Sequence, residues 1–564
     1  MGVQVERLGT SRSDADLFTL HPICNIFKMR QLKAMPRTAT IPKVESPAPA
    51  PPVLPRLRLG KLCVAIQATS PQELIDRAEA ALADALPEAR LLEFRLDSIA
   101  KPALALPKVK EFLLRHRDVT AIGTCRRKQH GGNFVGSLAA QLEILQSAAE
   151  AGCHLVDLEV ESAEEAKSGQ LAKFRAALRE AGCALIISFH DFTRTKGLEQ
   201  AAERIEAFEP DYVKVVSTAR SLSDNLAVLK LIEDHSLGAE VIGIAMGEEG
   251  LLSRVLGPRA GGSFTFGSSE DGEETAPGQI TARALRDLYR IEQLDQATRI
   301  FGVAGNPISH SLSPLMHNTA FKRENVNAIM LPLKVKTLND MLTVVRELPL
   351  GGVAVTMPLK QEVLPQLANM DPLTAKIGAC NTLRTGADGK LYGFNTDVAG
   401  VVRPLERRLR LQGARVAVLG AGGAARAAVF ALVGQGAEVY VVNRTHETAV
   451  ALARQAKAKS LKHEVFAKQK FDVLVNATPC GMVGGKEAMP IAANELNASL
   501  VFDMVYNPLE TPLIKLAKSR GIPVVSGLEM FVQQGARQFE IWTGKPAPEA
   551  EMMRVVELEL RRRG

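Results

Sequence analysis

Eight short apolar segments recur at nearly even intervals between residues 62 and 268, and this repeat limits the fold more than any other feature of the chain. Successive segments begin 22 to 36 residues apart, which leaves room for one strand, one helix and two loops in each unit. Eight such units predict a (β/α)8 barrel, a fold that needs roughly 250 residues. The segments are LCVAIQAT (62–69), LLEFRLDS (91–98), VTAIGTCR (119–126), LVDLEVE (155–161), ALIISFHD (184–191), YVKVVS (212–217), EVIGIAMG (240–247) and GSFTFGS (262–268).

The sixth segment carries a lysine, Lys214, in the middle of an apolar run. Burying a lysine is costly unless the amine is used. An amine that condenses with a ketone makes the neighbouring carbon easier to deprotonate, and a base must then lie within hydrogen-bond reach of that carbon. His190 ends the fifth segment, and adjacent strands lie about 4.8 Å apart, so we expect both side chains to face one substrate. Polar residues at strand ends, where barrels carry their chemistry, are Glu93, Arg95, Arg126, Asp157, Glu159, His190 and Lys214.

Composition excludes several classes of protein. At 564 residues the chain has room for two to four domains. No uncharged apolar stretch approaches 18 residues, so we expect no membrane span. The net charge of +7 is spread along the chain, without a basic stripe carrying aromatics, so nucleic acid is not an expected partner. The seven cysteines form no CxxC pair, which predicts a reduced cytoplasmic protein with no metal site.

Residues 1–57 lack sustained periodicity and end in the Ala/Pro-rich ESPAPAPPVLP (45–55). Such a segment cannot bury enough apolar surface to fold, so we expect a disordered extension. Two alternatives stay open: a transit peptide for plastid import, or a start at Met29 or Met35.

A second αβ alternation follows the barrel, after a stretch expected to be helical at 280–297. Strand-like runs at 299–305, 328–335 and 352–358 lead to RVAVLGAGGAARAAVFAL (415–432), which reads as a strand, a Gly-rich turn and a helix. Gly420, Gly422 and Ala425 match the pattern G-x-G-x-x-G/A, whose small residues let backbone amides approach a pyrophosphate. This context predicts a dinucleotide-binding site.

The next strand, EVYVVNRT (438–445), selects the cofactor. An NAD site usually ends this strand with an acid that binds the ribose 2′-hydroxyl. Here the strand ends in Asn443, Arg444 and Thr445, and a guanidinium can hold a 2′-phosphate through paired, charge-assisted bonds. We therefore expect NADP, with a solvated surface role for Arg444 as the alternative.

Seven segments of residues 299–564 closely resemble shikimate dehydrogenases. They are GNPISHSLSPLMHN (305–318), VTMPLK (355–360), GACNTL (378–383), GFNTDVAG (393–400), VNATPCGM (475–482), FDMVYNPLETPL (502–513) and GLEMFVQQGARQF (527–539). The resemblance implies that Lys360 and Asp397 are the catalytic pair and that Ser311 and Ser313 bind the substrate carboxylate. The implied lining of the substrate site adds Thr356, Asn381, Tyr506 and Gln534. Candidate cofactor-binding residues are Gly420, Ala421, Gly422, Gly423, Ala424, Asn443, Arg444, Thr445, Thr478 and Gly527.

A proton donor beside the ketone agrees with this chemistry, because hydride reduction builds alkoxide charge that an ammonium can neutralise. The sequence departs from the family pattern at Ala354, where many members have Asn two residues before the threonine. That change puts one local hydrogen bond in doubt.

The barrel resembles type I 3-dehydroquinate dehydratases over roughly residues 60–285. The matching pieces are EFRLD (93–97), TCR (124–126), DLE (157–159), SFHDF (188–192), YVKVV (212–216), MGEEGLLSR (246–254), FTFG (264–267) and TAPGQ (275–279). The resemblance implies a Schiff base on Lys214 and general acid/base catalysis by His190. Residues implied to hold the substrate's hydroxyls and carboxylate are Glu93, Arg95, Arg126, Arg254, Thr275 and Gln279.

One departure affects the barrel chemistry. The family commonly has a glutamate four residues after the arginine at position 126, where it orients the catalytic histidine, and this chain has His130 there. An imidazole cannot replace a carboxylate in holding an imidazolium. Asp157 and Glu159 are two residues apart on one strand and share a face, so either could serve instead. We expect a slower dehydratase or a displaced pH optimum.

The sequence thus predicts a bifunctional α/β enzyme that dehydrates 3-dehydroquinate to 3-dehydroshikimate and reduces it to shikimate with NADPH; a fusion of these activities is familiar from plants. Two alternatives remain: a dehydrogenase that also oxidises quinate, and a barrel that only binds. The expected domains are the extension (1–57), the barrel (58–286), the substrate domain (299–402 and 529–564) and a Rossmann NADP-binding domain (403–528).

Overall fold

The computed structural model describes residues 59–84, 90–235, 240–484 and 487–563. The expected extension at 1–57 lies outside this part of the chain. Among the described residues, no helix has the length and apolar character needed to cross a membrane.

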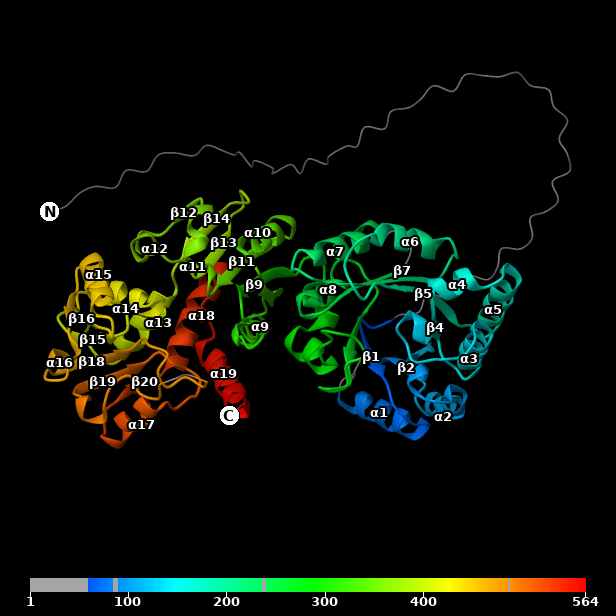
Figure 1. The fold of residues 1–564 in the computed structure, drawn as a ribbon, viewed down its shortest axis with the longest axis horizontal. Helices are drawn as coiled ribbons and strands as arrows, with labels where there is room; N and C mark the ends of the chain where they lie inside the picture. Colours follow the sequence, from blue (N-terminus) through cyan, green and yellow to red (C-terminus); the bar gives the residue numbers. More distant parts are fainter. Residues whose placement is uncertain (1–58, 85–89, 236–239, 485–486, 564) are drawn as a thin grey trace, which may run out of the picture. The chain divides into compact units, whose positions relative to one another are not determined.

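The first half is a barrel of parallel strands (Figure 1). From β1 to β7 each strand pairs with the next along the chain, and β8 returns to pair with β1. No ladder of described residues joins β7 to β8, so the barrel is nearly closed. The strands are β1 (Leu62–Ile66), β2 (Leu91–Arg95), β3 (Thr120–Thr124), β4 (Leu155–Glu159), β5 (Ala184–His190), β6 (Tyr212–Thr218), β7 (Glu240–Met246) and β8 (Thr265–Ser268).

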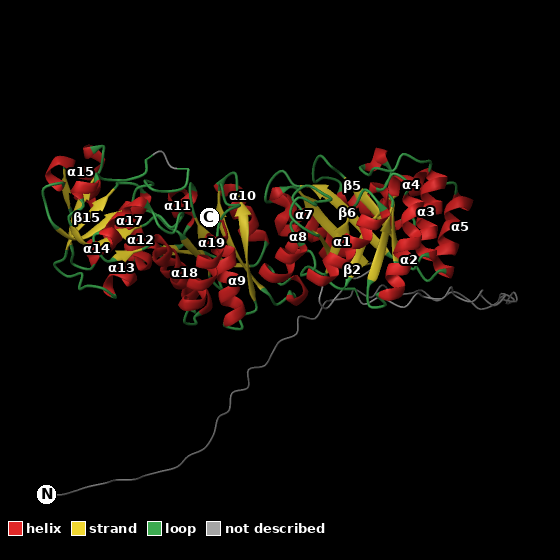
Figure 2. Ribbon diagram, turned by 90° about the horizontal axis from the view of Figure 1, so that it is seen from below, coloured by secondary structure: helices red, strands yellow, loops and turns green. Residues whose placement is uncertain are grey.

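Helices cover the outside of these strands (Figure 2). They are α1 (Pro71–Asp84), α2 (Leu106–Arg115), α3 (Leu138–Glu150), α4 (Val160–Glu165), α5 (Ser168–Glu180), α6 (Leu198–Glu206), α7 (Asp224–His235) and α8 (Leu251–Leu256). The helix expected over 280–297 is interrupted: a π-helical turn covers Ala284–Leu288 and a 3-10 turn covers Ile291–Gln293. Arg290 between them has φ 52°, a left-handed conformation that cannot continue a right-handed helix.

Alternation along the strands separates the barrel interior from the layer under the helices. On β6, Val213 and Val215 pack outward in the main core, whereas Tyr212 and Val216 belong to the interior cluster. Lys214 lies between these two interior residues, so the strand period itself turns its side chain inward.

The second half contains two further sheets. The first has strand order β10-β9-β11-β13-β14-β12 and is mixed, since β13 runs antiparallel to both β11 and β14. Its strands are β9 (Arg299–Gly305), β10 (Ala328–Lys334), β11 (Leu350–Val355), β12 (Asn369–Met370), β13 (Thr382–Thr385) and β14 (Leu391–Phe394). Its helices are α9 (Ser313–Arg323), α10 (Leu338–Glu347), α11 (Leu359–Glu362) and α12 (Pro372–Ile377).

The last sheet is parallel, with order β17-β16-β15-β18-β19-β20. Renumbered from its first strand this is 3-2-1-4-5-6, the order of dinucleotide-binding folds. Its strands are β15 (Arg415–Leu419), β16 (Glu438–Val442), β17 (Lys459–Leu461), β18 (Phe471–Asn476), β19 (Ala498–Asp503) and β20 (Val524–Val525). The accompanying helices are α13 (Asp397–Glu406), α14 (Gly423–Gly434), α15 (His446–Ala456), α16 (His463–Phe466) and α17 (Pro512–Ser519).

Two C-terminal helices, α18 (Gly527–Thr543) and α19 (Glu549–Arg563), return to the first part of this half. Helix α18 packs against β11 and β13 of the mixed sheet, and α19 packs against α9 and α18. Phe539 and Trp542 of α18 share a core cluster with Phe301 of β9 and Phe321 of α9. Residues 299–323 and 527–563 therefore bury a common apolar surface although they lie far apart in the sequence.

Candidate active sites

The barrel holds a pocket at the carboxyl ends of its strands. All eight residues expected from the sequence line it: Glu93, Arg95, Arg126, His190, Lys214, Arg254, Thr275 and Gln279. Phe266 and Phe192, which the sequence did not single out, complete the wall. Among described residues, no cluster of three or more His, Cys, Asp or Glu side chains could hold a metal ion.

Lys214 is buried, with 4% of its surface exposed. Its Nζ donates to Asp157 Oδ2 at 2.8 Å and lies 3.8 Å from Glu93 Oε1. The ammonium also sits over the Phe266 ring, 4.2 Å from its centroid. Two carboxylates and an aromatic face thus offset the cost of burying this charge. These contacts hold the residue inside the pocket.

Burial by itself raises the pKa of Asp157, but the charges of Lys214 and Arg126 outweigh that effect and hold the pKa below its usual value. The same carboxylate accepts from Arg126 Nη2 at 3.2 Å and from Ser188 Oγ at 2.6 Å. Asp157 is therefore ionised and links three polar groups of the pocket.

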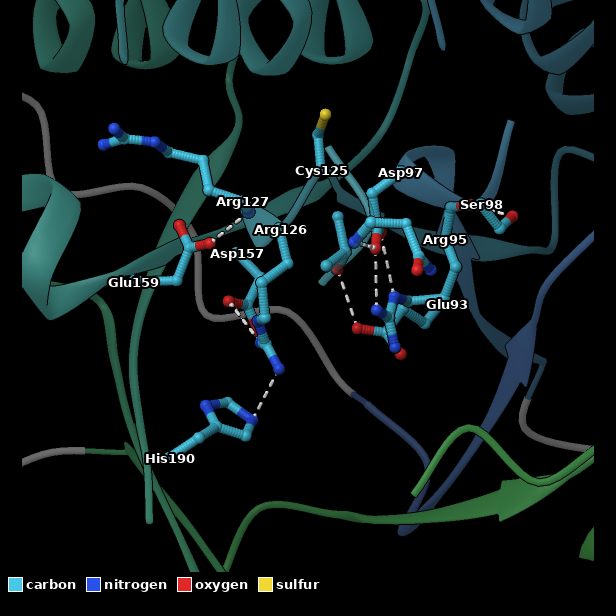
Figure 3. A network of polar contacts seen from close by, with 12 residues as sticks. Glu93, Arg95, Asp97, Ser98, Cys125, Arg126, Arg127, Asp157, Glu159 and His190 are labelled. Atoms are coloured by element: carbon cyan, nitrogen blue, oxygen red, sulfur yellow. Dashed lines mark hydrogen bonds and ion pairs between the residues drawn. The ribbon is translucent and has the colours of Figure 1, made fainter. Parts of the chain in front are cut away.

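His190 is connected to this network through Arg126 (Figure 3). Arg126 Nη1 lies 2.7 Å from His190 Nε2, and because a guanidinium can only donate, Nε2 accepts and the proton sits on Nδ1. Burial, with the charges of Arg126 and Lys214, lowers the pKa of His190 well below the ordinary 6.5. The imidazole is thus neutral at neutral pH, and its one lone pair accepts from Arg126.

Of the two strand-four acids, only Asp157 acts on the histidine. Its charge raises the pKa of His190, against the lowering effects of burial and the cations. Glu159 accepts instead from the Arg127 backbone N at 2.7 Å (Figure 3). It also accepts from Gln141 Nε2 at 2.5 Å. No hydrogen bond or ion pair between described residues joins Glu159 or His130 to His190. Burial raises the pKa of Glu159, and this effect outweighs the lowering effects of the Arg126 charge and of the hydrogen bonds from Arg127 and Gln141.

Arg254 offers unused donors to the pocket. It is 1% exposed, and its Nη1 donates to the Phe266 carbonyl at 3.1 Å. Within the described part of the chain its Nε and Nη2 have no hydrogen-bond partner, and burial lowers its pKa to about 10. Unpaired buried donors are expensive, so this guanidinium suits an anionic group of a ligand. Arg95, by contrast, is already bound to Asp97 through two bonds of 3.0 and 2.9 Å.

The second half holds another pocket, and the eight catalytic and substrate residues expected there all line it. They are Ser311, Ser313, Thr356, Lys360, Asn381, Asp397, Tyr506 and Gln534. Ala354, the departure from the family pattern, is buried and also faces this pocket.

Lys360 and Asp397 form the polar centre of this pocket. Lys360 Nζ donates to Asp397 Oδ2 at 2.6 Å, and Asn381 Nδ2 donates to Asp397 Oδ1 at 2.8 Å. Asp397 is the first residue of α13, where the helix dipole favours a carboxylate. The arrangement holds an ammonium at a fixed point of the pocket, ready to donate a proton.

Sequence reasoning missed Gln538 as a pocket residue. Its Nε2 donates to Thr382 Oγ1 at 3.1 Å, and it lies four residues after Gln534 on α18. That one-turn spacing was a signal that could have predicted a shared face.

The turn between β15 and α14 fits a dinucleotide. It carries Gly420–Ala424; Gly420 has φ 111°, and a Cβ there would meet the Ala477 carbonyl at 3.0 Å. Nothing lies within 4 Å of a Cβ built on Gly422 or Gly423, so the start of α14 is open to a pyrophosphate.

The rest of the expected cofactor set is divided among three places. Asn443, Arg444 and Thr445 follow β16, and the Arg444 side chain is 88% exposed, with its Nη1 3.1 Å from Glu487 Oε1. Thr478, whose Cγ2 would lie 3.2 Å from a Cβ on Gly420, borders the glycine turn. Gly527 instead lines the substrate pocket, where a Cβ would meet the Val505 backbone at 2.4 Å.

Comparisons with known families divide the chain in the same way. Residues 62–296 match type I 3-dehydroquinase. Residues 303–383 match the shikimate dehydrogenase substrate binding domain, residues 404–505 match shikimate / quinate 5-dehydrogenase, and residues 527–557 match the shikimate 5′-dehydrogenase C-terminal domain.

Similar proteins cover both halves. A chloroplastic bifunctional 3-dehydroquinate dehydratase/shikimate dehydrogenase of Arabidopsis thaliana is 34% identical over 482 residues, 82% of this chain and 78% of the relative. The shikimate dehydrogenase (NADP(+)) of Methanosarcina acetivorans is 42% identical over 46% of this chain and 98% of its own. Among solved structures, shikimate 5-dehydrogenase from Thermus thermophilus, in complex with NADP(H) and shikimate, is 35% identical over 47% of this chain and 99% of its own, with a TM-score of 0.43.

Proposed function

The chain belongs to the family of bifunctional 3-dehydroquinate dehydratase/shikimate dehydrogenases, and from this premise we propose how its residues carry out the two reactions. The barrel dehydrates 3-dehydroquinate to 3-dehydroshikimate, and the second half reduces that product to shikimate with NADPH. The observation that carries the dehydratase assignment is Lys214, a buried amine in one pocket with a neutral histidine.

In the barrel, the Lys214 amine adds to the substrate ketone and expels its oxygen as water, which leaves an iminium. His190 then removes a proton from the neighbouring carbon and returns it to the hydroxyl one carbon further, which leaves as water. A second water hydrolyses the imine and frees the product and the lysine. The register of β5 and β6 supports joint action of Lys214 and His190. Ser188 is opposite Lys214 and His190 is opposite Val216, so His190 lies two residues further along its strand than the position opposite Lys214.

The cations of the pocket bind the substrate's carboxylate. Arg254 has two unpaired buried donors, and Arg126 spends one of its donors on His190. Because His190 Nε2 accepts from Arg126, the guanidinium has to turn toward the substrate before Nε2 can take a proton from carbon. Glu93, which accepts from Thr124 Oγ1 at 2.7 Å, is placed to bind a substrate hydroxyl.

In the second half, NADPH supplies the hydride when it is bound. Lys360 donates a proton to the ketone oxygen as alkoxide charge develops, and Asp397 keeps that ammonium charged and in place. Ser311 and Ser313 bind the substrate carboxylate, while Thr356, Asn381, Tyr506 and Gln534 surround the ring. Arg444 is positioned to take the 2′-phosphate in exchange for Glu487, which supports NADP over NAD.

Reduction with borohydride tests whether Lys214 forms a Schiff base with the substrate. Purified protein is treated with borohydride in the presence of 3-dehydroquinate, and the covalent adduct is mapped by peptide mass spectrometry to Lys214. Lys214→Ala should abolish dehydration and leave shikimate oxidation near normal. Far-ultraviolet circular dichroism of the variant shows whether the barrel is still folded. An active dehydratase whose Lys214 stays unmodified would contradict the Schiff-base mechanism.

Two further points stay proposals. Assays with quinate and with shikimate decide whether the dehydrogenase accepts only shikimate. The alternative of a barrel that binds without catalysis is disfavoured, because Lys214 and His190 line one pocket. We also propose a cytoplasmic, reducing location, supported by six cysteines that are buried free thiols among the described residues.

A further inference from the structure

Helix α19 brings an arginine to the rim of the dehydrogenase pocket. Met552, Val556 and Leu560 form the buried stripe of this helix and belong to the same core cluster as α9 and α18. Arg563 lies three residues after Leu560 and seven after Val556, so it follows this stripe at the end of the helix, where its side chain is 39% exposed.

Two contacts hold the guanidinium there. Arg563 Nη1 donates to the backbone carbonyl of His310 at 3.2 Å, and Nε is 2.8 Å from Glu559 Oε1. The Glu559 side chain is 16% exposed, which makes it a well-ordered anchor for the arginine. The fork geometry of a guanidinium allows both bonds at once, which a lysine ammonium cannot reproduce with the same planarity.

The carbonyl that Arg563 binds is part of the substrate site. His310 lines the pocket and directly precedes Ser311, one of the two serines proposed to hold the substrate carboxylate. The positive charge also reaches the opposite wall, because Arg563 lowers the pKa of Tyr506 against the dominant raising effect of burial. A single side chain thus acts on two parts of the rim.

We propose that Arg563 is a positioning residue of the dehydrogenase, which holds the His310–Ser311 segment in place for the carboxylate of an anionic substrate. It acts through the loop and through its charge, without touching the reacting atoms. The effect is on substrate binding, and the chemical step at Lys360 is left unchanged. This inference rests on the proposed shikimate dehydrogenase function.

The matched experiment compares Arg563→Ala with Arg562→Ala in the full-length chain. Arg562 is the neighbouring arginine and pairs with the same Glu559 at 2.9 Å, but no hydrogen bond of described residues joins it to the loop. Arg563→Ala should raise KM for shikimate about fivefold to tenfold, the loss expected for one partly exposed charge-assisted hydrogen bond, with kcat within about twofold. KM for NADP should not change, and Arg562→Ala should resemble the unmodified enzyme.

The salt dependence of KM for shikimate, measured with Arg563→Lys, separates the effect of the positive charge at position 563 from that of the guanidinium geometry. Arg563→Lys should keep the salt dependence of KM for shikimate, while restoring only part of the affinity. Trp542 fluorescence reports whether the dehydrogenase half of each variant is folded, and dehydratase activity serves as a control for the other half. Equal KM values in the two alanine variants, or a fall in kcat at unchanged KM, would overturn the role of Arg563. Absence of shikimate oxidation by the unmodified enzyme would instead overturn the proposed function.

Discussion

Replacing Asp157 by asparagine tests the organisation of the barrel site most directly. The carboxylate lies between Lys214 at 2.8 Å and Arg126 at 3.2 Å, and its side chain is 0% exposed. Asparagine keeps the shape of the side chain and removes the charge, so two buried cations lose their shared counter-ion. Removal of one partner from a buried ion pair typically costs about 3–5 kcal/mol, because the remaining charge is left uncompensated.

The sign of the pH dependence follows from the lowered pKa of Asp157. A carboxyl whose pKa is depressed by folding contributes stability above the ordinary carboxyl pKa of about 3.9, and this contribution is lost as pH falls through the lower folded value. The full penalty of Asp157→Asn should therefore be present at pH 7. We also expect kcat of the dehydratase to fall about 10²- to 10⁴-fold, since Lys214 and His190 both lose their alignment.

The chain offers a separate signal for each half. Its single tryptophan, Trp542, is buried in α18 beside Phe301, so intrinsic fluorescence reports unfolding of the dehydrogenase half. Urea unfolding followed by far-ultraviolet circular dichroism detects loss of the barrel as well. Asp157→Asn should move the barrel transition to lower urea and leave the Trp542 transition in place.

Glu159→Gln is the matched control on the same strand. Glu159 is also buried, but it bonds a backbone amide and the Gln141 side chain, and burial already raises its pKa. We expect a cost of about 1–2 kcal/mol from the altered hydrogen bonds and a much smaller loss of kcat. If Glu159→Gln lowers kcat as much as Asp157→Asn does, Asp157 is not the acid that organises the site.

His130→Glu completes this comparison. If Asp157 already serves His190, a new carboxylate at position 130 should change dehydratase kcat little. If position 130 reaches the histidine, the variant should raise kcat or move the acidic limb of the kcat/KM profile upward, because an anion raises the pKa of His190. Should neither His130→Glu nor Asp157→Asn affect dehydration, the requirement for an orienting carboxylate is wrong for this enzyme.

Three further predictions concern the dehydrogenase half. Replacing Lys360 or Asp397 should each lower kcat about 10²- to 10⁴-fold, and the double variant should lose far less than the product; fully multiplicative losses would mean that the two act independently. Arg444→Ala should raise KM for NADPH much more than KM for NADH, and equal use of both cofactors by the unmodified enzyme would contradict the 2′-phosphate assignment. Burial lowers the pKa of His317 to about 4, so stability should fall by up to about 3 kcal/mol as pH drops from about 6.5 to 4, and His317→Gln should remove this loss from the Trp542 fluorescence transition.

Local patterns were sufficient for most of the fold and of the candidate sites. The spacing of the apolar segments predicted the barrel, and the Gly-rich turn after a strand predicted the dinucleotide fold. Strand alternation also placed Lys214 inside, because a period of two assigns every second residue to the interior. The family motifs then named residues that line both pockets.

Tertiary structure alone decided which groups meet. Alternation puts Asp157 and Glu159 on one face, yet Glu159 stands at the end of β4 and bonds the loop at Arg127, whereas Asp157 lies one pleat deeper and reaches Lys214. The Arg563 contact with His310 spans 253 residues. Contacts of this kind depend on how whole elements pack, and a periodic pattern along one strand or helix carries no information about the side chain that another element brings to it.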